Sequence, residues 1–218
     1  MKSAASRAPD LREDSIVYVI DDDASMRSAL SGLLRSAGFE VFAFERIGEF
    51  TAFPKTDAPS CLLLDVRLRG ESGLTYQREA CRQPFHIPII LLTAHGDIEM
   101  SVQAMKEGAA DFLTKPVKDQ RLIDAVVAAH TTDASLKVLQ RRRAAIQALY
   151  DLLTRREREV IHHVVDGMLN KQIAAAMQLS EITVKIHRSA AMRKLLAASV
   201  ADLVRKMETL RASSNARG

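Results

Sequence analysis

Short apolar runs alternate with segments of helical periodicity along the first 130 residues of the chain. The apolar runs predict five β-strands, Ile16–Ile20, Phe39–Phe44, Cys61–Asp65, Ile89–Thr93 and Asp111–Thr114. Apolar residues spaced three or four positions apart predict helices over residues 26–37, 47–53, 74–81, 98–107 and 121–129. Strands that are almost continuously apolar and alternate with helices predict a parallel sheet covered on both faces. The expected fold class of this part is α/β, with a five-stranded, doubly wound parallel sheet.

The pattern changes near residue 150, after which only helical periodicity is found. Thr154 and Glu157 have the spacing of a capping box, in which hydroxyl and carboxylate satisfy each other's free amides at a helix start. That helix is expected to end at Gly167, and Asn170 and Ser180 are expected to cap the next two. Those helices are predicted over residues 171–177 and 180–196, followed by a fourth over 199–207. Two short helices joined by a tight turn indicate a small all-α helix-turn-helix domain, whose second helix enters the DNA major groove.

A further helical segment is predicted between these two parts. Residues 130–151 contain a partial apolar stripe formed by Leu136, Leu139, Ile146 and Leu149. Such a helix could be a rigid arm or a seam between two copies of the chain. The expected domains are therefore 15–133 for the α/β domain, 134–151 for a helical linker and 152–210 for the helix-turn-helix domain.

Charge is divided unevenly between the two parts. Residues 1–133 contain 15 lysines and arginines and 20 aspartates and glutamates, a net charge of −5, whereas residues 134–218 contain 16 and 7, a net charge of +9. An acidic first part and a basic second part indicate two modules with different partners, the second with a polyanion. A basic surface that only faces solvent is the alternative, and charge alone does not separate the two.

The cysteines and the lengths of the apolar runs indicate the cellular compartment of the protein. Cys61 and Cys81 are too few for a disulfide framework, and Cys61 lies in an apolar run, so reduced thiols are expected. No apolar run reaches the roughly 20 residues that span a bilayer. We therefore expect a cytoplasmic protein with no membrane partner.

Polar side chains stand at the ends of four predicted strands. Asp21 and Asp22 follow the first strand, Asp65 ends the third, Thr93 ends the fourth and Lys115 follows the fifth. The carboxyl ends of parallel strands meet at one edge, where α/β folds bind their ligands, so we expect these side chains to lie together. Carboxylates gathered there repel one another unless a cation lies among them, and Mg²⁺ is the hard cation that suits such oxygens. One carboxylate could then attack a phosphoryl group whose oxygens are stabilised by Thr93 and Lys115.

Two other interpretations of these residues remain open. A single aspartate at a strand end, such as Asp65, more often caps the next helix or turn, and Asp23 is expected to cap the first helix rather than bind metal. A metal-dependent phosphohydrolase of haloacid-dehalogenase type would use similar residues, but its nucleophile would be Asp21 or Asp23 at the first strand. The five residues share one chemistry, which is harder to explain by capping.

Four segments resemble the receiver domain of bacterial two-component response regulators: Val19–Asp23, Leu63–Arg67, Leu92–His95 and Phe112–Pro116. The resemblance implies a flavodoxin-like fold in which Asp65 accepts phosphate from a sensor histidine kinase. It also implies a Mg²⁺ site formed by Asp21, Asp22, Asp65 and the backbone carbonyl of Arg67, with Thr93 and Lys115 on the phosphoryl oxygens. Phe112 would be the switch aromatic, and the Lys115–Pro116 bond would be cis. The family's usual Met-Pro after the phosphoacceptor loop is replaced here by Leu68-Arg69.

The predicted helix over residues 180–196 has two distinct faces. Val184, Ala191 and Leu195 share one side and are expected in the core. On another side, Lys185 can donate to guanine acceptors and Ile186 can contact a thymine methyl. The residues expected to contact DNA are Lys185, Ile186, Ser189 and Arg193 on this side, and Lys171, Thr183, Arg188 and Lys194 as contacts to the DNA backbone.

The second part also resembles a known family, the LuxR/FixJ-type DNA-binding domain. The resemblance lies in Leu153–Val160, Asn170–Ala174 and Thr183–Arg188. Both resemblances together imply a phosphorylation-dependent transcriptional regulator of the NarL/FixJ-like class, and not an enzyme. It would form a homodimer when phosphorylated and bind a double-stranded DNA operator, with RNA polymerase as a further candidate partner. A constitutive DNA-binding protein whose first domain is only a docking surface is the remaining alternative.

Overall fold

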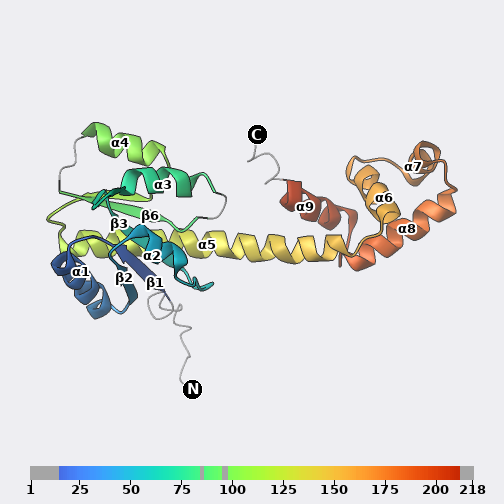
Figure 1. The fold of residues 1–218 in the computed structure, drawn as a ribbon. Coiled ribbons are helices and arrows are strands. Elements are labelled where there is room, and N and C mark those ends of the chain that lie inside the picture. Colours follow the sequence, from blue (N-terminus) through green and yellow to red (C-terminus); the bar gives the residue numbers. More distant parts are fainter. Residues whose placement is uncertain (1–14, 84–85, 95–97, 212–218) are drawn as a thin grey trace, which may run out of the picture. The chain divides into compact units, whose positions relative to one another are not determined.

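The computed structural model describes residues 15–83, 86–94 and 98–211 (Figure 1). The chain divides into two compact units, Met1–Val138 and Leu139–Gly218. Each unit has its own buried apolar core, and each is described separately below. None of the helices in the described ranges is long and apolar enough to cross a bilayer.

The first unit is built on a sheet of five parallel strands, which confirms the predicted α/β class. The strands are β1 (Ile16–Ile20), β2 (Glu40–Phe44), β3 (Ser60–Asp65), β6 (Ile89–Thr93) and β7 (Asp111–Thr114), arranged in the order β2-β1-β3-β6-β7. Every residue of β1, β3 and β6 is buried, because both faces of the sheet are covered. The strand order places a topological switch point beside β1 and β3, whose carboxyl ends are therefore the expected ligand edge.

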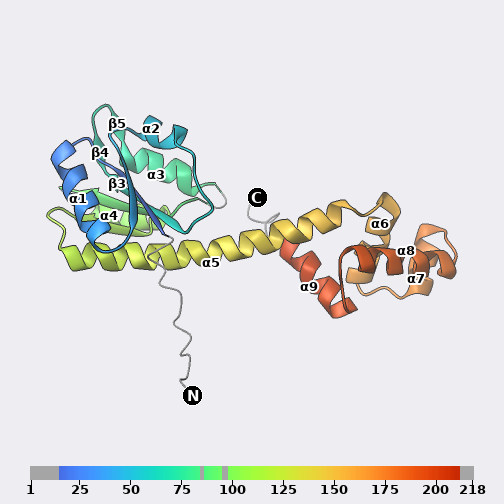
Figure 2. The ribbon, with the colours of Figure 1, turned by 90° about the horizontal axis from the view of Figure 1, so that it is seen from below.

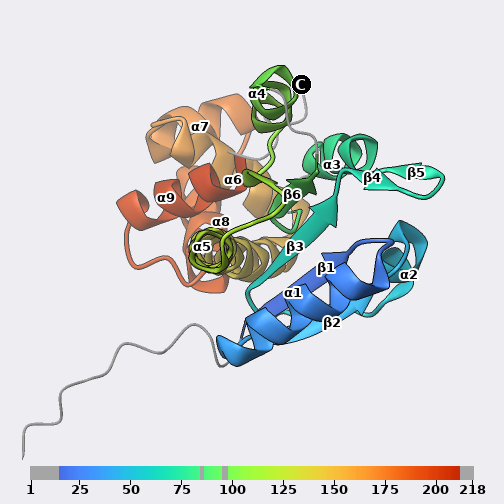
Figure 3. The same cartoon turned by 90° about the vertical axis from the view of Figure 1, so that its left-hand side faces the viewer.

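Helices cover both faces of this sheet (Figure 3). They are α1 (Ala24–Ser36), α2 (Ile47–Ala52), α3 (Gly73–Cys81), α4 (Ile98–Lys106) and α5 (Asp119–Asp151). Leu34 of α1 and Val126 of α5 belong to the core cluster on one face, whereas Phe50 of α2 and Ala104 of α4 belong to the cluster on the other. Successive residues of a strand point to opposite faces, so each strand contributes to both clusters.

A two-stranded hairpin follows β3 and was not predicted. Its strands are β4 (Arg67–Leu68) and β5 (Glu71–Ser72), which pair antiparallel (Figure 2). Strands of two residues are too short to show an alternating pattern, which is why periodicity does not reveal them. The turn contains Gly70 at φ +78°, a backbone conformation that glycine adopts without steric cost.

Helix α5 is much longer than the predicted closing helix. The segments predicted as helical over 121–129 and 130–151 form one helix of 33 residues, so the linker helix continues directly from the closing helix. No glycine or proline occurs between its ends to stop it. Its middle part is bound to the sheet, since His130 Nε2 donates to the Ile16 carbonyl oxygen (2.9 Å) and Asp133 Oδ2 accepts from the Ser60 amide (2.8 Å).

The second unit contains four further helices, α6 (Arg155–Val165), α7 (Asn170–Met177), α8 (Glu181–Lys194) and α9 (Val200–Arg211). Their core includes the three residues of α8 and its C-terminus that were predicted to be buried, Val184, Ala191 and Leu195, each 0 % exposed. The capping box of Thr154 and Glu157 is present, and Ser180 accepts from the Thr183 amide at the start of α8. Gly167 lies beyond the end of α6 at φ +84°, as its proposed stop role requires.

One capping prediction in this unit was wrong. Asn170 is the first residue of α7 and not its cap, because the preceding Leu169 occupies the cap position. The Leu169 amide is satisfied by Gln172 Oε1 (2.8 Å) instead. The Asn170 side chain is consequently free to accept from Arg188 Nη1 (2.9 Å), a hydrogen bond that joins α7 to α8.

Candidate functional site

Three aspartates lie together at the carboxyl edge of the sheet in the first unit. Asp65 is the last residue of β3, while Asp21 and Asp22 follow the neighbouring strand β1. One carboxylate oxygen from each lies within 4.8 Å of one from each of the others. Asp21 is 1 % exposed and Asp65 is 9 % exposed, so two of the three acids are largely withdrawn from water.

Lys115, which follows β7, reaches across the edge to two of these acids. Its Nζ donates to Asp21 Oδ2 (2.6 Å) and to Asp65 Oδ2 (2.5 Å). Thr93, at the end of the intervening strand β6, is 1 % exposed. The Lys115–Pro116 peptide bond is cis, as the receiver resemblance implies. One ammonium therefore contacts two of the three carboxylates of the cluster at once.

Burial and hydrogen bonding act against each other in this cluster. Burial raises the pKa of Asp21, although the hydrogen bond from Lys115 opposes the rise. Burial would lower the pKa of Lys115, but its hydrogen bonds to Asp21 and Asp65 outweigh burial and raise that pKa. The cluster thus retains an ammonium that stays charged and an excess of carboxylate over cation.

Backbone amides hold two of the aspartates in place. Asp21 Oδ1 accepts from the Asp23 amide (2.9 Å), and Asp65 Oδ1 accepts from the Arg67 amide (2.9 Å). Asp23 itself caps α1, accepting from the amides of Ser25 and Met26, as its sequence position predicts. The Arg67 amide thus holds Asp65, and the expected role of the Arg67 carbonyl as a metal ligand stays a prediction.

Two further residues of this site were not identified from the sequence. A β-carbon at Gly73 would lie 2.1 Å from the Asp65 carbonyl oxygen, so only glycine fits beside the end of β3. Arg69 forms an ion pair with Asp22, Nε to Oδ2, at 3.1 Å. The departure of Leu68-Arg69 from the family pattern was the available signal for Arg69, whereas nothing in the sequence marks Gly73 as a close contact of Asp65.

Phe112 lies in β7, one strand away from β3, and is partly buried against the core cluster that contains Ala104 and Ala109. His95, in the third receiver-like segment, lies outside the described residues.

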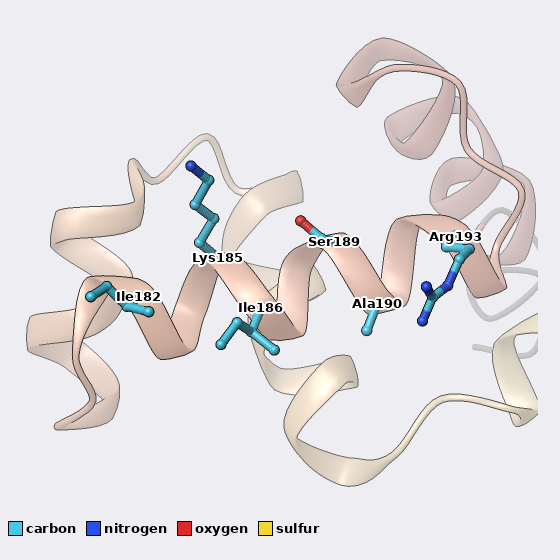
Figure 4. Close-up of a pocket in the computed structure, with 6 residues that line it drawn as sticks. All are labelled: Ile182, Lys185, Ile186, Ser189, Ala190 and Arg193. Carbon is cyan, nitrogen blue, oxygen red and sulfur yellow. The ribbon is translucent and has the colours of Figure 1, made fainter.

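The DNA-contacting residues predicted in the second unit fall into two groups. Lys185, Ile186, Ser189 and Arg193 are exposed and, together with Ile182 and Ala190, line a hollow of about 420 Å³ along α8 (Figure 4). Ile182 is 73 % and Ile186 is 62 % exposed, which is unusual for large apolar side chains. Ile182 was not predicted, although its position one turn before Ile186 places it on the same side.

In the other group, Thr183, Arg188 and Lys194 already have partners within the unit. Lys194 Nζ donates to Glu157 Oε2 (2.7 Å) and to the Leu152 carbonyl oxygen (3.2 Å). Arg188 donates to Asn170, and the Thr183 hydroxyl is 2.8 Å from the Ser180 hydroxyl. Lys171 is exposed at the start of α7. The structure therefore gives Lys194 and Arg188 intramolecular contacts that a helix viewed alone does not reveal.

Comparison with known families covers both units. Residues 17–127 match the response regulator receiver domain family. Residues 151–207 match the luxR family of bacterial regulatory proteins. The two matched segments coincide with the sheet-containing unit and with the helices α6 to α9.

Individual relatives combine both parts in one chain. Nodulation protein W of Bradyrhizobium diazoefficiens is 51% identical over 201 residues, which cover 92% of this chain and 88% of the relative. The transcriptional regulatory protein FixJ of Azorhizobium caulinodans is 38% identical over 189 residues, covering 87% of this chain and 90% of the relative. Among solved structures, that of the response regulator StyR is 40% identical in sequence and superposes with a TM-score of 0.76. The superposition covers 89% of this chain and 98% of the StyR chain.

Proposed function

The chain belongs to the two-component response regulators that combine a receiver domain with a LuxR-family DNA-binding domain, and from this premise we propose that phosphorylation of Asp65 controls its binding to DNA. As a transcriptional regulator, it has a sensor histidine kinase as the expected phosphodonor and double-stranded DNA as the expected target. The observation that carries the proposal is the contact of one ammonium, Lys115, with both Asp21 and Asp65 at the end of β3. A bacterial DNA target also makes the cytoplasm the expected place of action.

The Asp65 carboxylate has the position of a nucleophile for phosphoryl transfer. Its oxygen attacks the phosphorus of a phosphohistidine, the O–P bond forms as the N–P bond breaks, and the electron pair returns to the imidazole nitrogen. Lys115 then follows the new negative charge from the carboxylate to the phosphoryl oxygens, and the Thr93 hydroxyl donates to another of them. The Arg67 amide keeps Asp65 oriented throughout, since it holds the other carboxylate oxygen.

The acidic cluster fits Mg²⁺, the cation that receivers use. Three carboxylates of which two are nearly buried need more positive charge than Lys115 supplies, and their oxygens lie close enough to share one ion. Asp21, Asp22 and Asp65 would hold the metal, with the backbone carbonyl of Arg67 as a further ligand. When bound, Mg²⁺ neutralises negative charge on the phosphoryl group and its carboxylate acceptor.

The switch is proposed to pass from Thr93 and Phe112 to the outer surface of α4, β7 and α5. Movement of Thr93 toward the phosphoryl group vacates space that Phe112 enters, which remodels this surface. Helix α4 exposes Ile98, Val102 and Met105, of which Ile98 is 83 % exposed. A second phosphorylated copy would cover these apolar side chains, so the active form would be a homodimer that reads two half-sites.

Helix α8 is the proposed reading helix of each copy. Lys185, Ile186, Ser189 and Arg193 line its exposed side, where cationic and apolar groups can reach guanine acceptors and thymine methyls. Lys171 and Thr183 would contact the DNA backbone, while Lys194 and Arg188 would do so only by sharing or leaving their present partners.

The proposed domains are 15–133 for the receiver, 134–151 for the linker and 152–210 for the DNA-binding domain. RNA polymerase remains a candidate partner at a promoter.

The phosphorylated residue can be mapped directly. The full chain is incubated with Mg²⁺ and a small phosphodonor such as acetyl phosphate, reduced with borohydride, and analysed by peptide mass spectrometry. We expect modification of Asp65 in the wild type and none in the Asp65→Asn variant. Modification of Asp21 or Asp23, with multiple turnover of a phosphomonoester, would instead support a phosphohydrolase of haloacid-dehalogenase type and contradict the proposal.

A further inference from the structure

Arg69 lies at the tip of the β4–β5 hairpin and reaches the acidic cluster from outside. Its Nε is 3.1 Å from Asp22 Oδ2, in an ion pair in which the Arg69 side chain is 81 % exposed and the Asp22 side chain 23 % exposed. Lys115 forms its two ion pairs with Asp21 and Asp65, and the ion pair of Asp22 is made by Arg69 instead. The three carboxylates therefore have two resident cations, the half-buried Lys115 on Asp21 and Asp65 and the exposed Arg69 on Asp22.

The backbone of the hairpin holds Arg69 in position for this contact. Leu68 pairs with Glu71, so Arg69 and Gly70 are the two central residues of a tight turn. Gly70, the second central residue, has φ +78°, as a type II turn requires, and the first central position of such a turn accepts proline and most other residues. Glu71 Oε2 accepts from the Ile47 amide at the start of α2 (3.2 Å), which fixes the hairpin on its other side. The contact with Asp22 is therefore made by an exposed side chain on an anchored hairpin.

We propose that Arg69 is a built-in competitor of the metal ion for Asp22, and that it thereby sets the divalent-cation affinity of the receiver. This inference rests on the proposed metal site. Asp22 Oδ2 cannot bind a divalent cation at full strength while it accepts the guanidinium, so metal binding requires Arg69 to leave. Because the side chain is mostly in water, it can leave without breaking any packed contact, and the ion pair acts as a reversible cover.

The structure also limits the size of the effect. Exposed ion pairs contribute between nothing and about 1 kcal/mol, which corresponds to a change in Kd of at most about fivefold. Removal of Arg69 should therefore strengthen Mg²⁺ binding by about two- to fivefold. The gain should shrink as salt is added, because screening weakens an exposed pair first.

Mg²⁺ binding to the unphosphorylated full-length chain, measured by isothermal titration calorimetry at fixed ionic strength, tests the proposal. The variants are Arg69→Ala and Arg69→Pro, both of which suit the turn. Arg46→Ala is the matched control, since Arg46 is exposed, precedes α2 and has no ion pair among the described residues. We expect tighter binding in both Arg69 variants and a smaller change in the control.

A double-mutant cycle with Asp22→Asn separates local competition from a general charge effect. In the Asp22→Asn background, Arg69→Ala should no longer tighten Mg²⁺ binding, because the contested oxygen has lost its charge. Equal Kd values for wild type and Arg69→Ala, or a gain that persists beside Asp22→Asn, would overturn the competitor role and leave the metal site intact. Absence of Mg²⁺ binding in wild type and Arg69→Ala alike would overturn both the competitor role and the metal site.

Discussion

Replacing Lys194 by alanine should destabilise the second unit more than it weakens DNA binding. Lys194 donates to Glu157 Oε2 (2.7 Å), and the same oxygen accepts from the Thr154 amide (2.7 Å) in the capping box of α6. The Glu157 side chain is only 7 % exposed, so its carboxylate would lose its charged partner in a site that water barely reaches. Removing one partner of a fully buried ion pair costs about 3–5 kcal/mol.

The cost at Lys194 should be smaller than in a fully buried pair. The Lys194 side chain is 32 % exposed, and the Thr154 amide remains as a partner of Glu157, so we expect about 1–2 kcal/mol. In a unit of this size such a loss lowers Tm by roughly 5–15 °C. A melt of the whole chain reports on both units. The unfolding of the second unit should therefore be followed locally, by hydrogen exchange of the amides of α6 and α8 as temperature rises.

Lys185→Ala is the matched comparison, because it removes the same charge from the exposed side of α8. It should leave the melting of α6 and α8 unchanged and weaken binding to DNA fragments that the protein itself selects from a random pool. Lys194→Ala should lower the melting temperature of α6 and α8 and weaken DNA binding less than Lys185→Ala does. If Lys194→Ala melts like wild type and loses as much DNA affinity as Lys185→Ala, Lys194 is a DNA contact and the structural interpretation of its ion pair is refuted.

Two further predictions concern the first unit. Burial lowers the pKa of His130 in the folded protein below its ordinary value of 6.5. At a pH between the folded and the unfolded pKa, His130 is protonated in the unfolded chain but not in the folded one, so the free energy of unfolding decreases as pH falls through 6.5. Thermal melts at pH 7.5 and 5.5 should show this loss in wild type and less of it in His130→Gln; equal losses would contradict it. Gly73→Ala should displace the end of β3, because its β-carbon would lie 2.1 Å from the Asp65 carbonyl oxygen, and lower Tm, whereas Gly32→Ala, with no atom within 4 Å, should not. An unchanged Tm in Gly73→Ala would contradict this prediction, because the end of β3 would then shift without a cost in stability.

Three of the strands that position the site, β1, β3 and β6, were predictable because their sequences are nearly continuous apolar runs. Such runs arise where both faces of a parallel sheet are covered, and each ends where the sheet edge meets water. The grouping of Asp21, Asp65 and Lys115 follows from the same rule, since parallel strands end at one edge. The hydrogen bonds between these side chains do not follow from that rule, because the distances between their atoms depend on how far each side chain extends past its strand.

The features that were not predicted depend on contacts between elements or on very short segments. The two-residue strands of the hairpin are too short to show a period. Lys194 belongs to the basic side of α8 when that helix is considered alone. Only the packing of α6 against α8 reveals that Glu157 lies within its reach. Asn170 has the residue type of a cap, yet Gln172 satisfies the free amide and Asn170 pairs with Arg188.

The most direct test of the central claim compares DNA affinity before and after phosphorylation of one carboxylate. Fluorescence anisotropy at fixed salt would measure Kd for a selected DNA fragment, with and without a small phosphodonor, for wild type and Asp65→Asn. The account predicts that the phosphodonor tightens binding by at least tenfold in wild type, the effect of about 1.4 kcal/mol, and leaves Asp65→Asn unchanged. Equal affinities of wild type in both conditions, or a response that survives in Asp65→Asn, would contradict it.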